Sequence, residues 1–119
     1  MKPDHSFHDY IVHDVLGYLP GITSRSMFGG WGIYQNGLIF GLIAAGELYF
    51  KVNDDNRQIF IDLGSKPFTY DTKDGSKATM AYWSVPEEVF MKRDELSKLV
   101  QGSVAASVAG KAKSVKRKK

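Results

Sequence analysis

An Asn-Gly pair at residues 36 and 37, set between two apolar runs, most constrains the fold of this chain. A type I′ turn needs positive φ at both central residues, and Asn-Gly adopts that geometry readily. Residues 31–34 and 38–44 on either side have strand composition. Ala45-Gly46 marks a second turn before a third strand at residues 47–52. We therefore expect an antiparallel meander with one buried face and one solvated face.

Apolar residues at helical spacing predict a first helix over residues 4–19, which Pro20-Gly21 ends. Asp4 and Ser6 are competing caps for its start. Residues 23–28 predict a short strand, which Gly29-Gly30 interrupts before the next strand. The buried stripe of the helix comprises Phe7, Ile11, Val12, Val15, Leu16 and Leu19.

Residues 53–64 are ambiguous, because Ile59-Phe60-Ile61 also suits a strand. We prefer a helix that Asn53 or Asp54 caps and that Gly64 ends in the left-handed conformation. Residues 66–70 and 78–85 predict a second hairpin around a polar turn.

Pro86 followed by two glutamates opens the last helical region, and Asp94 caps a longer final helix. The stripe predicted to be buried on that helix comprises Leu96, Leu99, Val100, Val104 and Val108. The order of elements is helix, three or four strands, helix, two strands, helix. It predicts a two-layer α+β fold, in which helices pack on one face of an antiparallel sheet. We expect a single domain over residues 1–109 and a disordered basic tail over 110–119.

The charge is unevenly distributed. Six of the 16 basic residues lie after residue 110, which leaves 10 basic against 13 acidic residues in the body. The tail either binds nucleic acid weakly through phosphate contacts or acts as a solubilising end. The residues concerned are Lys111, Lys113, Lys116, Arg117, Lys118 and Lys119. The sequence has no cysteine, no long apolar run and no leader-like N-terminus, so we expect a cytoplasmic protein with no membrane contact.

No set of residues indicates catalysis, a cofactor or a metal. His5 and His8 can share a helix face and bind a metal, but exposure near a helix end explains them better. Residues 29–32 are glycine-rich and can be interpreted as a phosphate-binding loop. Strands flank them on both sides, however, which favours a structural bulge or tight turn. Ser24, Ser26 and Ser84 lack a nucleophile motif, and no predicted His–acid pair activates them. We expect a non-enzyme.

Aromatic residues alternate with cations along the predicted sheet, which fits either nucleobase stacking or ordinary sheet packing. If Leu48 and Phe50 face the helices, Tyr49 and Lys51 face outward. An arginine in an apolar strand, Arg25, either pairs with Asp62 or Glu47 or contacts a partner; we favour the structural pair. The candidate partner-binding residues are Arg25, Gly29, Gly30, Trp31, Tyr34, Tyr49 and Lys51.

Several motifs, in order over roughly residues 10–100, resemble the N-terminal domain of the TfoX/Sxy family of bacterial competence regulators. They are the run 25–34, Phe40-Gly41-Leu42-Ile43, Leu48-Tyr49-Phe50-Lys51, Gly64, Pro67-Phe68-Thr69-Tyr70, Met80-Ala81-Tyr82-Trp83 and Pro86. The resemblance implies a two-layer fold with no catalytic residues. Full-length members carry a second, helical domain, so the chain resembles a stand-alone N-terminal module.

The resemblance further implies a non-catalytic co-regulator of competence and DNA-uptake genes that acts through protein–protein contacts. The expected partner is the transcription machinery or a promoter-bound activator such as the cyclic-AMP receptor protein, and a homodimer is compatible with this role. The alternative is a small ligand- or nucleic-acid-binding domain that uses the glycine-rich turn or the basic tail.

Overall fold

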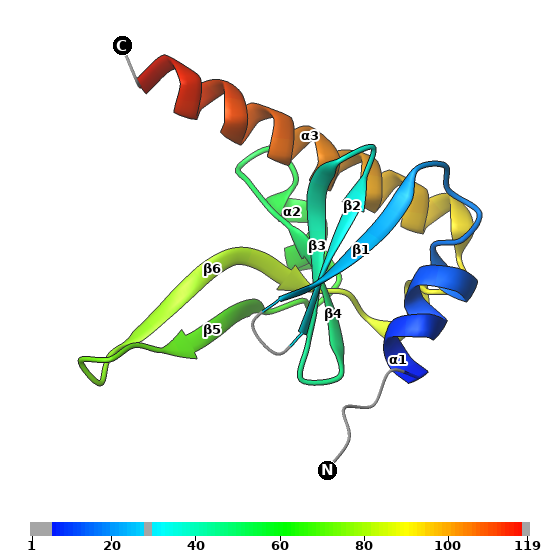
Figure 1. The fold of residues 1–119 in the computed structure, drawn as a ribbon, viewed down its shortest axis with the longest axis horizontal. Helices are drawn as coiled ribbons and strands as arrows, with labels where there is room; N and C mark the ends of the chain where they lie inside the picture. The colour runs from blue at the N-terminus through cyan, green and yellow to red at the C-terminus, as the bar shows by residue number, and fades with distance from the viewer. Residues whose placement is uncertain (1–5, 28–29, 118–119) are drawn as a thin grey trace.

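The computed structural model describes residues 6–27 and 30–117, apart from the side chains of 70–71, 77–80 and 110–117. The described residues form six strands and five helical segments (Figure 1). In order they are α1 (Ser6–Asp9), the π-helix η1 (Tyr10–Val15), β1 (Ile22–Met27), β2 (Gly30–Gln35), β3 (Leu38–Ala44), β4 (Glu47–Lys51), α2 (Arg57–Asp62), β5 (Pro67–Asp71), β6 (Lys77–Ser84), the 3-10 helix η2 (Glu87–Val89) and α3 (Arg93–Arg117). None of the helices described is long and apolar enough to cross a membrane.

The strands form one antiparallel sheet in the order β1-β2-β3-β4-β6-β5. Its first two predicted turns are confirmed by their backbone angles. Asn36 and Gly37 have φ of 51° and 84°, and Ala45 and Gly46 have φ of 52° and 75°. These positive values are the geometry that tight hairpin turns between twisted strands require. The meander therefore follows from the turn residues.

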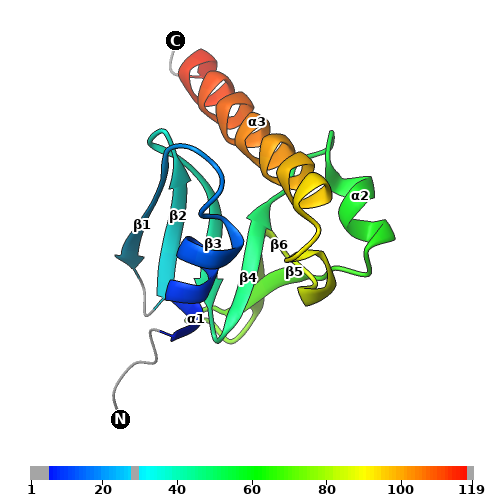
Figure 2. The same ribbon diagram turned by 90° about the vertical axis from the view of Figure 1, so that its right-hand side faces the viewer.

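The helices cover one face of the sheet, which confirms the α+β class and the two-layer arrangement. In Figure 2, α3 and the N-terminal helical region lie against the same side of the central strands. The core under them contains fully buried side chains from both layers. These include Ile11, Leu16, Ile33, Phe40, Phe50 and Leu96, each with 0% exposure. Phe40 and Phe50 pack edge to face, with ring centroids 5.5 Å apart.

His8 fixes the N-terminal helix to the sheet. Its ring stacks on Trp31 of β2 with centroids 3.8 Å apart, and its Nε2 lies 2.8 Å from Ser24 Oγ of β1. The His8 side chain is only 12% exposed. The prediction that His8 is an exposed residue near a helix end is therefore wrong, because the sheet covers this turn. His5 lies outside the described residues.

A backbone carbonyl joins β4, α2 and α3. The Lys51 oxygen accepts hydrogen bonds from Asn56 Nδ2 at 3.0 Å and Ser103 Oγ at 2.8 Å. Asn56 Oδ1 also accepts from the Asn53 N–H at 2.7 Å. Asn56, rather than Asn53 or Asp54, is thus the N-cap position of α2, and its side chain serves this junction instead of capping the helix.

The predicted end of α2 is confirmed. Gly64 has φ of 77°, and the Gly64 and Ser65 N–H groups donate to the Ile61 and Phe60 carbonyls, each at 3.0 Å. This is the arrangement by which a left-handed glycine satisfies the last carbonyls of a helix.

α3 differs from its prediction in length and in its buried stripe. Its backbone passes Gly110 and continues to Arg117, and Val108 is 49% exposed. Small residues pack against the sheet in its second half: Ser103, Ala106 and Ser107 are 0%, 2% and 5% exposed. The buried positions follow Leu99 and Ser103 at three- and four-residue spacing to Ala106 and Ser107, and Val108 lies off this stripe. The division into a domain over 1–109 and a disordered tail stays a prediction.

We expect Ser103→Ala to lower the free energy of unfolding by about 1 kcal/mol, since it removes one of two side-chain donors from the partly buried Lys51 carbonyl. Ser107→Ala is the matched control. Ser107 is also buried on α3, but no comparable bond joins its hydroxyl to a strand in the described part of the chain. Urea unfolding of both variants measures the difference. Equal stabilities would contradict the role given to this junction.

We expect His8→Ala to destabilise the fold by about 1–2 kcal/mol, because it removes a ring stack and a partly buried hydrogen bond. His13 is exposed on the same helical region, so His13→Ala should have little effect. Thermal melts of the two variants beside the wild type make the comparison. A neutral His8→Ala would show that the helix is held by its apolar stripe alone.

Candidate functional site: the outer face and free edge of the sheet

Four of the predicted partner-binding residues share the sheet face that the helices leave open. Residues paired across antiparallel strands project to the same face. The pairs Arg25–Gly32, Gly32–Leu42, Leu42–Tyr49 and Lys51–Tyr82 run across this face from β1 to β6. Tyr34 lies two residues after Gly32 on β2, so its side chain projects to the same face. Trp31 does not, because it projects to the helix face and stacks on His8.

Two aromatic residues of this face are already packed. Tyr49 and Tyr82 are 9% and 7% exposed. The Phe68 ring meets the Tyr49 ring edge to face at 5.0 Å, and Lys51 Nζ lies 5.8 Å from the Tyr82 ring centroid. Burial raises the pKa of both phenols, with Glu47 adding to the effect at Tyr49 and Tyr34 at Tyr82. These two rings therefore offer little surface for nucleobase stacking.

Arg25 is exposed in the middle of β1, and no described residue forms an ion pair with it. The expected partner Asp62 lies on α2 and accepts a hydrogen bond from Gln58 Nε2 at 2.9 Å. The other expected partner, Glu47, is exposed. The favoured prediction of an intramolecular pair is therefore wrong for the part of the chain that is described. Since no described residue pairs with it, the Arg25 guanidinium is available to meet a partner.

The glycines at the start of β2 serve close packing. A Cβ on Gly30 would lie 2.1 Å from the Ile43 carbonyl oxygen, and one on Gly32 would lie 2.6 Å from Met27 Cε. Both distances are shorter than side-chain contacts allow. Gly29 lies outside the described residues. The two described glycines therefore have a packing role and do not line the described pocket, so the alternative of a ligand site here gains no support.

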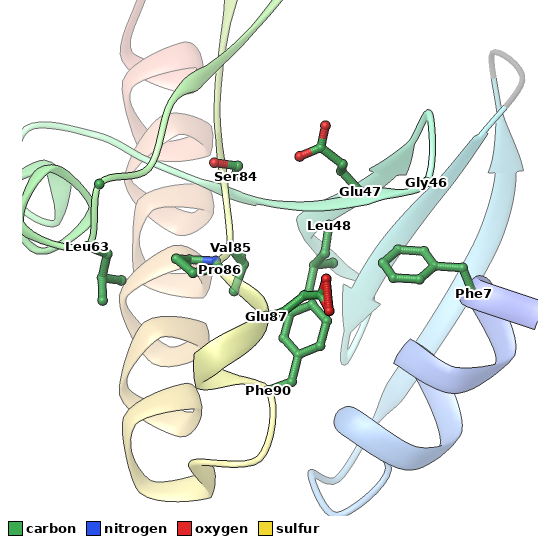
Figure 3. A pocket seen from close by; sticks show the side chains of 11 residues that line it. Phe7, Gly46, Glu47, Leu48, Leu63, Ser84, Val85, Pro86, Glu87 and Phe90 are labelled. Carbon is green, nitrogen blue, oxygen red and sulfur yellow. The ribbon is translucent and has the colours of Figure 1, made fainter.

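A pocket of about 380 Å³ lies elsewhere, between α1, the β3–β4 turn, the end of α2 and η2 (Figure 3). Phe7, Leu48 and Phe90 form an apolar wall, while the Glu47 and Glu87 carboxylates supply acidic groups. No described basic residue pairs with either glutamate. None of the predicted site residues lines this pocket.

The structure also joins three residues that sequence reasoning kept apart. His8 Nε2 lies 2.8 Å from Ser24 Oγ, and His8 Nδ1 lies 2.9 Å from Asp9 Oδ1. A Ser–His–Asp chain is the arrangement of an activated nucleophile, and the expectation that no His–acid pair reaches a serine is wrong. However, Asp9 is 62% exposed, Trp31 covers the imidazole, and Ser24 lines no described pocket. Sixteen residues separate His8 from Ser24, so no local pattern could have predicted the contact.

Among the described residues, no group of three His, Asp or Glu side chains is close enough to hold a metal ion. The backbone of residues 111–117 continues α3 away from the sheet (Figure 1). Nucleic-acid binding by these basic residues remains a prediction, as does partner binding by the residues of the open face.

Comparison with known proteins gives the family. The sequence model of the TfoX N-terminal domain matches residues 14–107. The chain is 26% identical to Protein Sxy of Escherichia coli (strain K12) over 102 residues, which are 86% of this chain and 48% of that protein. It is 32% identical to DNA transformation protein TfoX1 of Aliivibrio fischeri (strain ATCC 700601 / ES114) over 85 residues, 71% of this chain and 40% of that protein. The chain thus spans less than half the length of these relatives. It belongs to the TfoX N-terminal domain family, which confirms the resemblance.

Proposed function

We propose that this TfoX N-terminal domain is a non-catalytic regulatory module that helps to switch on genes for DNA uptake. It acts by contacting another protein, either the transcription machinery or a promoter-bound activator. Support comes from the family, and from the relative TfoX1, whose name describes a DNA transformation protein. A protein that acts at bacterial promoters is located in the cytoplasm, so this function includes a cytoplasmic location.

The observation that carries this proposal is the state of Arg25. Its charge is exposed on an open sheet face and has no ion-pair partner among the described residues. Half-buried apolar groups of Met27 and Tyr34 lie on the same face. An arginine beside aromatic and methionine side chains is the composition found at the centres of protein–protein interfaces. Farther across the same face, the packed phenols of Tyr49 on β4 and Tyr82 on β6 form a platform rather than a site for chemistry.

The basic C-terminal run supports a second, auxiliary role. Six cations with no acid after residue 95 suit weak, salt-dependent contact with promoter DNA. Such a contact would raise the local concentration of the module near its protein partner. The tail adds affinity, while the open face determines which partner is bound.

Arg25→Ala should abolish most activation of a DNA-uptake gene reporter in the host bacterium with its own copy deleted, yet leave the melting temperature nearly unchanged. A surface substitution costs within about 0.5 kcal/mol of stability, because no internal contact is lost. Arg57→Ala is the matched control. Arg57 is also an exposed arginine, but it pairs with Asp54 Oδ1 at 2.7 Å on the opposite layer.

Pull-down of purified RNA polymerase and of the cyclic-AMP receptor protein by wild type and both variants identifies the partner. The expected result is retention by wild type and Arg57→Ala, and loss by Arg25→Ala. Full reporter activity of Arg25→Ala, or a large loss of stability, would overturn the assignment of Arg25 as a contact residue.

A further inference from the structure

β1 is a free edge of the sheet. It pairs with β2 along all six residues, and no described strand pairs with its other side. Figure 2 shows β1 at the margin of the molecule, with the rest of the sheet on one side only. A free edge presents unpaired N–H and C=O groups, which can bind another extended chain.

The pattern of hydrogen bonds between β1 and β2 shows which N–H and C=O groups of β1 point away from β2. The Asn36 N–H donates to the Gly21 carbonyl at 2.9 Å, so Gly21 and Asn36 form a hydrogen-bonded pair. Pairs of this kind alternate along an antiparallel ladder. Thr23, Arg25 and Met27 therefore bond to β2. The N–H and C=O groups that point outward belong to Ile22, Ser24 and Ser26.

The two edges of the sheet are not equivalent. β5, at the opposite edge, begins with Pro67, which has no N–H and blocks the pairing of another strand. β1 has no proline, and its register with β2 has no shift along all six residues. Arg25 is its one charged residue, and a charge on an edge strand restricts which chains can pair there.

Arg25 favours an acidic partner. On the outer side of β1, an antiparallel segment would form a non-hydrogen-bonded pair at Arg25, the pair type in which opposite side chains are closest. A carboxylate at that position meets the guanidinium on the open face. A second copy paired in the register centred on Arg25 would place two guanidinium groups opposite each other, which is destabilising.

We propose that β1 takes up an extended segment of a partner protein as an additional strand, and that Arg25 selects a segment with Asp or Glu opposite it. Backbone hydrogen bonds from Ile22, Ser24 and Ser26 supply the pairing, and the charge determines the register. This inference rests on the proposed function, which states that the partner is a protein. It adds that the bound segment is extended and acidic.

The first test uses a library of random seven-residue peptides displayed on phage, selected on the full chain and on Arg25→Glu. The wild type should enrich β-branched peptides with Asp or Glu at one fixed position, and Arg25→Glu should enrich Lys or Arg there. No enrichment, or the same peptides on both targets, would overturn the proposal. Enrichment of arginine-rich peptides by both targets would indicate the Glu47–Glu87 pocket instead.

The second test follows amide hydrogen exchange while the best enriched peptide binds. Exchange should slow at least about tenfold at the Ile22, Ser24 and Ser26 amides. It should change little at Thr23, Arg25 and Met27, whose amides β2 already protects. Slowing that does not alternate in this way would show that the peptide lies on the sheet face and not along its edge.

Ser26→Pro separates the inference from the proposed function. It removes an outward N–H and leaves the ladder with β2 intact, so peptide affinity should fall about tenfold or more with little loss of stability. Ser26→Ala, which keeps the N–H, is the control. If Arg25→Ala loses reporter activity while Ser26→Pro keeps it, strand addition is wrong and the partner binds the face. If both variants keep full activity, the proposed function itself fails.

Discussion

The structure depends on a single constraint, which is that the main apolar core lies on one face of the β2–β3–β4 meander. Ile33, Phe40 and Phe50 are fully buried there, and they are matched by Ile11 and Leu16 from the N-terminal helix and Leu96 from α3. Burying each such side chain contributes about 1.5–3 kcal/mol, so both helices must lie on that face. The opposite face and the β1 edge are consequently left for contacts outside the chain.

Lys51 connects the two layers. Its carbonyl oxygen holds α2 through Asn56 and α3 through Ser103, while its ammonium group lies over the Tyr82 ring on the open face. The same strand therefore anchors the helices and forms part of the outer platform. Since Tyr82 and Tyr49 are packed in place, the platform is rigid, and a partner that binds it loses little conformational entropy in this domain.

The part of the fold that local chemistry controls could be predicted from the sequence. Asn36-Gly37 and Ala45-Gly46 specify hairpin turns, and Gly64 specifies a helix end, because each needs positive φ. The helix predicted within residues 53–64 is also present, as α2 over Arg57–Asp62, and two of its isoleucines, Ile59 and Ile61, are about half exposed.

The errors concern contacts between distant segments. The contact of Phe68 with Tyr49 depends on how the β5–β6 hairpin bends. The contacts of His8 with Ser24 and Trp31 depend on where the N-terminal helix packs on the sheet. No spacing in the sequence encodes either one. Arg25 is a further example. An arginine flanked by apolar motifs suggests an internal ion pair, and only the fold shows that Asp62 lies in the helical layer. The sequence therefore supplied the candidate residues, the fold supplied their arrangement, and partner binding by them remains a proposal.

The most direct measurement is site-specific photo-crosslinking in the host bacterium, with the photoreactive residue at Thr23 on the open face beside Arg25. Ile61, an exposed apolar residue on α2, is the matched position away from that face. The expected result is a covalent adduct at position 23 with a component of the transcription machinery or a promoter-bound activator, identified by mass spectrometry, and none at position 61. Adducts at position 61 alone, or none with a transcription protein at position 23, would contradict the assignment of the open face and its β1 edge as the partner surface.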